Sequence, residues 1–361
     1  MTYSICTNTT PLCYLPSGEL VVYKHGEILI LSQNNVSKRI RIFSDIRERL
    51  CGRFRYIHRL ARLGIRASIA INENKILLSK GNHIYELDLT SGQLSNGFYC
   101  GVGIRPLCFT SVKGITTIDD GIYFGGYLGN SDRAPVNIYK YIGKDEWKVV
   151  YTFPQGSINH VHSIVSDTYR DCLWILTGDF DEAAAIWRVT DNFQECERVC
   201  FNNQKYRACV AFAVPEGLLY ATDTPFSDNY IYVLNPDTYQ LNVIQDIKGS
   251  CIYGCQWKDK YVFSSTVEGD GRSTSRLEFY FGRRRGVGIK DSYVHLYIGN
   301  LTNGFEDVYK EKKDFLPYYT FQFGVFKFPY GNNNSNRLYF QPIATNNDLK
   351  LMMIDDNRRN L

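Results

Sequence analysis

Apolar residues gather along the chain in short runs separated by turn-forming residues, a pattern typical of β-strands. One run, rich in Leu, Ile, Tyr and Phe and ending in small or polar residues, recurs at 75–79, 121–126, 172–178, 217–222, 260–265 and 337–341. A related run at 19–23 stands near the start of the chain. A later strand of the form Ile-Tyr-x-Leu echoes it at 83–87, 137–141, 185–189, 230–234 and 294–298. Repeated strand–turn–strand units without helical periodicity between them predict a β-propeller.

The number of repeats sets the expected architecture. Dividing 361 residues by seven gives about 52 per unit, close to the roughly 40 to 50 of known propeller blades. We therefore predict an all-β fold in which residues 1–361 form a single β-propeller domain of about seven four-stranded blades, although six or eight blades also fit the uneven spacing. Strands from the two ends of the chain are expected to close the ring in one blade. The longest unit contains a predicted loop insertion at about 268–292.

Residues 45–66 depart from the strand pattern. Ile46, Leu50, Phe54, Ile57 and either Leu60 or Ala61 recur at helical spacing, which predicts one amphipathic helix inserted between the first two blades. The same segment carries seven arginines: Arg47, Arg49, Arg53, Arg55, Arg59, Arg62 and Arg66. They form either a solvated face over an apolar stripe packed on the core, or a dock for an anionic membrane surface or acidic partner through Arg55, Arg59 and Arg62.

Composition narrows the function classes. Hydrophobic residues make up 44% of the chain, which is enough for a sizeable core, and 41 basic against 37 acidic residues give a net charge of +4, too mild to indicate nucleic-acid binding. The sequence contains neither a run apolar enough to span a bilayer nor a visible secretory signal. Eleven cysteines without a Cys-x-x-Cys pair argue against a disulfide framework and a zinc finger. We therefore predict a cytoplasmic protein with no metal and no cofactor.

Propeller geometry predicts where functional side chains gather. The start of the first strand and the end of the second strand of every blade meet at one rim of the central channel. The first position is occupied by Arg66, Arg105, His160, His162, Arg207 and Tyr253. The second position is occupied by Tyr127, Asp179, Asp223 and Glu268. These ten residues form the predicted site.

The residue types at this rim suit an acidic glycan. Arginines hold carboxylates by paired hydrogen bonds, so Arg66, Arg105 and Arg207, with Tyr127, are the predicted substrate-binding residues. The candidates for acid–base chemistry are His160, His162, Asp179, Asp223, Tyr253 and Glu268. A structural interpretation stands beside this one: histidines on strands pack, aspartates in turns cap their own backbone, and arginines pair between blades.

One segment resembles a known family. Residues 188–196 are similar to a degenerate Asp-box of the sialidase-like (BNR) propellers: Thr190 and Asp191 match, and Cys196 replaces the usual Trp. Gly103-Ile-Arg-Pro is faintly similar to the sialidase Arg-Ile-Pro motif. The whole chain also resembles uncharacterised propeller proteins of bacterial surface-polysaccharide loci. The resemblance implies a sialidase-like fold; sialidases use a Tyr–Glu pair as nucleophile and an Asp as acid, and no residue here takes those roles by motif.

Two functional hypotheses follow. In the first, the protein is an enzyme that cleaves a uronate- or sialate-containing oligosaccharide or polysaccharide, as a glycoside hydrolase or, by β-elimination, as a polysaccharide lyase. In the second, it is a non-catalytic propeller that binds glycan or protein at the same rim. The His, Asp and Glu residues at the rim favour the first hypothesis, whereas a large apolar rim would favour a protein scaffold.

Overall fold

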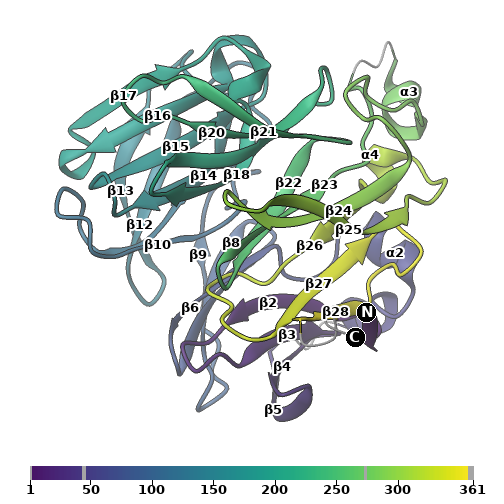
Figure 1. Ribbon diagram of the computed structural model, residues 1–361. Helices are drawn as coiled ribbons and strands as arrows, with labels where there is room; N and C mark the ends of the chain where they lie inside the picture. The colour runs from purple at the N-terminus through teal and green to yellow at the C-terminus, as the bar shows by residue number, and fades with distance from the viewer. Residues whose placement is uncertain (1, 43–45, 272–274, 357–361) are drawn as a thin grey trace.

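The strands form a closed ring of antiparallel sheets (Figure 1). The structure is a computed structural model and describes residues 2–42, 46–271 and 275–356, without the side chains of Ile46, Arg47, Arg49 and Asp181. Within these ranges there are seven sheets of four strands each. The predicted seven-bladed, all-β propeller is therefore confirmed. None of the helices in the same ranges is long and apolar enough to cross a bilayer.

In each blade the first strand lies nearest the channel, where it contacts the first strands of neighbouring blades. Blade 1 contains β2 (Thr10–Tyr14), β3 (Leu20–Lys24), β4 (Glu27–Ser32) and β5 (Asn35–Arg41). Blade 2 contains β6 (Ala67–Asn72), β7 (Lys75–Lys80), β8 (His83–Asp88) and β9 (Phe98–Tyr99). Blade 3 contains β10 (Thr110–Val112), β11 (Gly121–Gly125), β12 (Val136–Gly143) and β13 (Glu146–Phe153).

Blades 4 to 6 repeat this order. Blade 4 contains β14 (His160–Asp167), β15 (Cys172–Gly178), β16 (Ala185–Thr190) and β17 (Glu195–Cys200). Blade 5 contains β18 (Ala208–Val214), β19 (Gly217–Thr222), β20 (Asn229–Leu234) and β21 (Leu241–Ile247). Blade 6 contains β22 (Cys251–Trp257), β23 (Lys260–Ser265), β24 (Tyr293–Asn300) and β25 (Gly304–Lys312). Short 3-10 turns occur at Asp181–Ala183, Asp191–Phe193 and Gln204–Tyr206; the second of these carries the Asp-box-like residues between β16 and β17.

Blade 7 closes the ring with both ends of the chain. It contains β26 (Val325–Lys327), β27 (Arg337–Ile343) and β28 (Leu351–Asp355), and its outer strand is β1 (Thr2–Cys6). Strand β1 pairs antiparallel with β28, which sets Thr2 opposite Ile354 and brings the two ends together (Figure 1). The predicted closure is confirmed, because β1 from the start of the chain covers the edge of β28 from its end within one blade.

The hydrophobic cores lie between neighbouring sheets. All seven residues of β15 are buried because blades 3 and 5 cover the two faces of blade 4. Trp174, for example, packs with Tyr220 of blade 5, whereas Ile175 packs with residues of blade 3. A strand covered on both faces reads as a continuous apolar run, which explains why the second strands gave the clearest repeat.

The insertion between blades 1 and 2 is helical, but it is two six-residue helices, α1 (Ile46–Cys51) and α2 (Arg55–Leu60), rather than one. The expected apolar stripe is also wrong: Phe54, Ile57 and Leu60 are 62%, 44% and 52% exposed, whereas Arg59 is fully buried. Arg59 is drawn inward because Asp314 and Asp348 offer it carboxylates. Asp45, the predicted first residue, lies outside the described residues.

The helical segments of two insertions gather beside one end of the channel. The blade 6 insertion carries α3 (Arg276–Phe281), and α4 (Tyr318–Phe321) connects blades 6 and 7. Helix α4 contacts both α2 and α3 (Figure 1). The ring of Phe279 stacks on that of Tyr319 with centroids 4.3 Å apart. These segments form a wall around the mouth of the channel.

Candidate functional site

A cavity of about 540 Å³ lies at the mouth of the channel, beside the helical wall. Nine of the ten predicted site residues line it: Arg66, Arg105, Tyr127, His162, Asp179, Arg207, Asp223, Tyr253 and Glu268. The tenth, His160, contacts three of them through its ring: His162, Asp179 and Tyr127. The first strands begin at this mouth and the second strands end at it, so residues from blades 2 to 6 converge there. The structure therefore brings the predicted set together, while the role of each residue stays a prediction.

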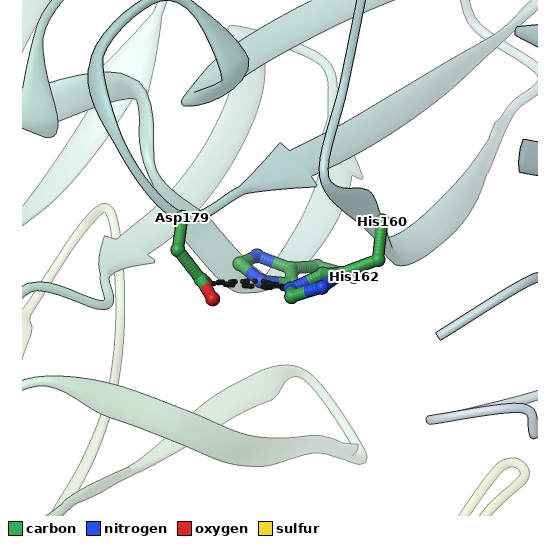
Figure 2. Close-up of side chains that lie close together, drawn as sticks. All are labelled: His160, His162 and Asp179. Carbon is green, nitrogen blue, oxygen red and sulfur yellow. Dashed lines mark hydrogen bonds and ion pairs between the residues drawn. The ribbon is translucent and has the colours of Figure 1, made fainter. Parts of the chain in front are cut away.

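Two histidines and an aspartate of blade 4 form a compact group at the wall of the cavity (Figure 2). His160 and His162 alternate on β14 and point to the same side, and Asp179 follows β15. The Nε2 atoms of the two histidines lie 3.1 Å apart. Oδ1 of Asp179 lies 3.1 Å from Nε2 of His162 and 3.4 Å from Nε2 of His160. The remaining ring nitrogens, both Nδ1, face backbone carbonyl oxygens of Leu128 and Ala208.

Arg207 joins this group to the next blade. Its guanidinium pairs with Oδ1 of Asp179 at 3.2 Å and with Oδ2 of Asp223 at 3.5 Å. Although burial alone opposes ionisation, the charge of Arg207 holds the pKa of Asp179 well below its usual range. Arg207 is therefore paired with two carboxylates of the chain, and its role in substrate binding stays a prediction.

Glu268, like Asp223, is a buried acid that lines the cavity. Its carboxyl accepts a hydrogen bond from the hydroxyl of Ser250 and is 5% exposed. Burial, and then the negative charge of Asp223, raise the pKa of Glu268 to about 8. Glu268 therefore holds a proton at neutral pH, whereas Asp179 is ionised, because the two acids occupy different electrostatic environments.

Positive charge also gathers in the cavity, around Tyr127. Arg62, Arg66 and Arg105 all line it, and no carboxylate of a described residue lies within 4 Å of their guanidinium nitrogens. The guanidinium carbons of Arg66 and Arg105 lie 5.3 and 5.8 Å from the ring centre of Tyr127. Each also has a buried Nε without a hydrogen-bond partner in the described part of the chain. Burial, and then the charge of Arg66, lower the pKa of Arg62 and Arg105.

The arginines of the helical insertion therefore do not share one exposed face. Arg59 is buried, whereas Arg62 is exposed, lines the cavity and donates a hydrogen bond to the carbonyl oxygen of Tyr319 at 2.8 Å. Arg55 is exposed and contacts Tyr56. The predicted dock for a membrane or acidic partner needs all three arginines on the surface, and this arrangement does not provide it.

Sequence reasoning missed Lys327, a further basic residue that lines the cavity. Lys327 ends β26, and its Nζ donates hydrogen bonds to the carbonyl oxygens of Ile65 and Arg66 at 3.1 and 2.7 Å. Burial, and then the charge of Arg66, lower the pKa of Lys327 to about 7. Its position in the first strand of blade 7 is equivalent to that of the predicted site residues, so locating that strand correctly would have found it.

The geometry also bears on metal binding, which the sequence did not predict. Among the described residues, two sets of three bring potential ligand atoms within 4.8 Å of one another: His160, His162 and Asp179, and His162, Cys209 and Asp223. Sγ of Cys209 lies 3.2 Å from Oδ2 of Asp223 and donates a hydrogen bond to it. Burial, and then Asp223, raise the pKa of Cys209, so the second set holds a thiol rather than the thiolate that binds metals.

Comparisons with known proteins agree on the fold. The chain is similar to the β-propeller domain of Cps50 (Swd1) from Myceliophteria thermophila, with a TM-score of 0.54 and 11% identity over 98% of this chain and 97% of that one. It is also similar to a chain of the mitotic checkpoint complex, with a TM-score of 0.55 and 6% identity over 98% and 93% of the two chains. No protein-family model and no curated protein matches the sequence. The comparisons do not support the resemblance to sialidase-like propellers, which stays a prediction.

Proposed function

We propose that this propeller is a binding protein that holds a carboxylate-bearing sugar, of the uronate or sialate type, in the cavity at the channel mouth. The observation that carries the proposal is the group of Arg62, Arg66 and Arg105, which lacks a carboxylate partner among the described residues. Partly buried guanidinium groups that repel one another are costly unless an anion offsets their charge. A planar carboxylate matches the two-pronged geometry of arginine.

The rest of the cavity suits a sugar. Its volume of about 540 Å³ falls within the usual range for small-ligand sites, roughly 300 to 1,000 Å³. The rings of Tyr127, Tyr253 and Phe226 line its walls and offer faces on which a sugar ring stacks. One structural neighbour is a chain of a multi-protein complex, which supports a binding role over a catalytic one.

Isothermal titration calorimetry with the full chain tests the proposal. We expect trigalacturonic acid or sialyllactose to bind, and galactotriose or lactose to bind far more weakly. Arg105→Ala is expected to weaken binding of the acidic sugar by about 30- to 1,000-fold, equivalent to the 2 to 4 kcal/mol for truncating one partner of a desolvated charge pair. Arg55→Ala, an exposed arginine of the same insertion as Arg62, is the matched control and should bind like the wild type. Equal binding of acidic and neutral sugars, or unchanged binding by Arg105→Ala, would contradict the proposal.

Cleavage of the bound glycan is a second candidate function, favoured by one observation. Glu268 stays protonated to about pH 8, whereas Asp179 is ionised far below neutral pH, and two acids separated in this way suit general acid and general base roles. Under this hypothesis Glu268→Gln abolishes release of reducing or unsaturated sugar ends but preserves binding. A binding protein shows no such release in the wild type.

A further inference from the structure

We propose that His160, His162 and Asp179 form a site for a single divalent transition-metal ion of the zinc class. The three facing atoms, two Nε2 and one Oδ1, are separated by 3.1, 3.1 and 3.4 Å. Around a tetrahedral zinc ion with bonds of about 2.0 to 2.1 Å, neighbouring ligand atoms lie about 3.3 to 3.4 Å apart. The triangle of side chains in Figure 2 is therefore already close to one face of a metal tetrahedron.

The hydrogen bonds around the histidines fix which ring nitrogens are free to bind. Nδ1 of His160 lies 2.8 Å from the carbonyl oxygen of Leu128, and Nδ1 of His162 lies 2.9 Å from that of Ala208. Because a carbonyl oxygen only accepts, each Nδ1 carries the proton and each neutral ring presents the lone pair of Nε2. Metal-binding histidines in proteins are oriented in the same way by hydrogen bonds from the other ring nitrogen.

The facing atoms therefore need a positive species between them. In the neutral tautomers, two imidazole lone pairs and a carboxylate oxygen meet at hydrogen-bond distance with no proton to share. Either a metal ion or an extra proton on one imidazole resolves this repulsion. Both ligand types, imidazole nitrogen and carboxylate oxygen, are those preferred by Zn²⁺, and the same two-histidine, one-carboxylate set also holds Fe²⁺.

The charges surrounding the three ligands also favour a cation. Asp179 and Asp223 supply two negative charges, and Arg207 supplies one positive charge in contact with both. The negative charge that remains is one that a bound cation offsets. Arg207 then acts as a positioning residue that holds the Asp179 carboxylate, as does Asn159, whose side-chain oxygen accepts a hydrogen bond from the Asp179 amide at 3.2 Å.

The proposed ion is accessible from the cavity. The Asp179 side chain is 25% exposed, and Asp179 and His162 line the same cavity as Arg66 and Arg105. Three protein ligands leave a fourth position for water or a ligand oxygen, as in zinc sites that act on bound molecules. The inference stands on the three ligands and goes beyond the proposed function, which depends on the arginines instead.

Metal titration of the full chain, stripped with EDTA and dialysed, tests the inference. We expect one Co²⁺ per chain with a visible absorption band typical of tetrahedral coordination, displaced by Zn²⁺. Separate titrations with Zn²⁺, anaerobic Fe²⁺ and Mg²⁺ identify the metal class, and Mg²⁺ should not compete. His162→Gln and Asp179→Asn should each weaken Co²⁺ binding by at least about 100-fold, above the 10- to 100-fold cost of losing an outer partner.

His295→Gln is the matched control. His295 is also a buried strand histidine with carboxylates beside it, but Asp307 lies at its Nδ1 and Asp291 at its Nε2, so they occupy opposite sides of the ring. This variant should bind Co²⁺ like the wild type. Circular dichroism and thermal melting establish whether each variant is folded. If His162→Gln does not fold, the conservative Asp179→Asn variant still tests the inference.

Some results would overturn the inference. These results are less than about 0.1 Co²⁺ bound per chain, Mg²⁺ binding as tight as that of Co²⁺, or unchanged Co²⁺ binding in both His162→Gln and Asp179→Asn. The first result would mean that a proton shared by the three side chains, and not a metal ion, occupies the site. Arg105→Ala separates this inference from the proposed function, because that variant should lose acidic-sugar binding and still bind one Co²⁺.

Discussion

Replacing Arg59 by Met should destabilise the protein strongly, because this arginine connects the helical insertion to blade 7 and to the segment around α4. Its side chain is fully buried, with Nη1 3.1 Å from Oδ2 of Asp348 and Nε donating a hydrogen bond to the carbonyl oxygen of Phe321 at 2.8 Å. It also pairs with Asp314. Methionine keeps the apolar stem of arginine but leaves the carboxylate of Asp348, which is 1% exposed, without its ion-pair partner.

The expected size follows from this burial. Removing one partner of a buried ion pair costs about 3 to 5 kcal/mol. Unfolding entropy of about 2.1 cal/mol/K per residue over 361 residues is about 0.8 kcal/mol/K, so the melting temperature should fall by about 4 to 7 °C. Differential scanning calorimetry measures this fall, and hydrogen exchange over residues 55–60 shows whether the insertion detaches before the blades unfold.

Two variants make the test specific. Arg55→Met changes an exposed arginine of the same helix and should shift the melting temperature by less than about 1 °C. Asp348→Asn, added to Arg59→Met, should restore part of the loss because it removes the uncompensated charge. A fall of less than about 1 °C in Arg59→Met, with unchanged exchange in α2, would refute the reasoning.

Three further predictions concern the cavity. In Gly178→Ala the new Cβ would lie 2.1 Å from Cε1 of His162, so the ring must move and Co²⁺ affinity in titrations should fall by about tenfold or more. The pKa of Lys327 is lowered to about 7, so this side chain gains charge as the pH falls from 8 to 6. Calorimetry should therefore show the affinity for the acidic sugar rising about fivefold, the effect of roughly 1 kcal/mol of added attraction. Lys327→Met should remove this rise. Glu268 has a pKa of about 8 in the folded state against an ordinary 4.5, so its contribution to folding stability falls as the pH rises between these values. The Glu268→Gln variant lacks this titration. Melting curves should therefore show its stability increasing relative to that of the wild type from pH 5 to 8.

The fold could be predicted because the blades share a strand pattern, which recurs in the sequence as a repeat. Each second strand, such as β15, is covered on both faces and must be apolar along its length, so its spacing reports the blades directly. The same regularity placed Asp179 and Asp223 at one end of the channel, because equivalent positions of successive blades share one rim. The convergence of the site thus followed from strand order alone.

The packing of the helical insertion was harder to predict, because ion pairs with residues far away in the sequence determine which of its side chains are buried. Helical spacing indicated that Phe54 and Ile57 pack inward, yet both are exposed and Arg59 is buried. Its carboxylate partners, Asp314 and Asp348, lie more than 250 positions away in the sequence, and no local pattern reports them. Arg207 and Lys327 could not be interpreted from the local sequence for the same reason. The partners of each basic side chain include residues of another blade, which are not its neighbours in the chain.

A crystal structure of the full chain grown with trigalacturonic acid tests the central claim most directly. The account predicts a sugar carboxylate in the cavity at hydrogen-bond distance from the guanidinium groups of Arg66 and Arg105, with the sugar ring against Tyr127. A cavity that holds only solvent at saturating ligand, or arginines that turn to pair with carboxylates of the chain itself, would contradict it.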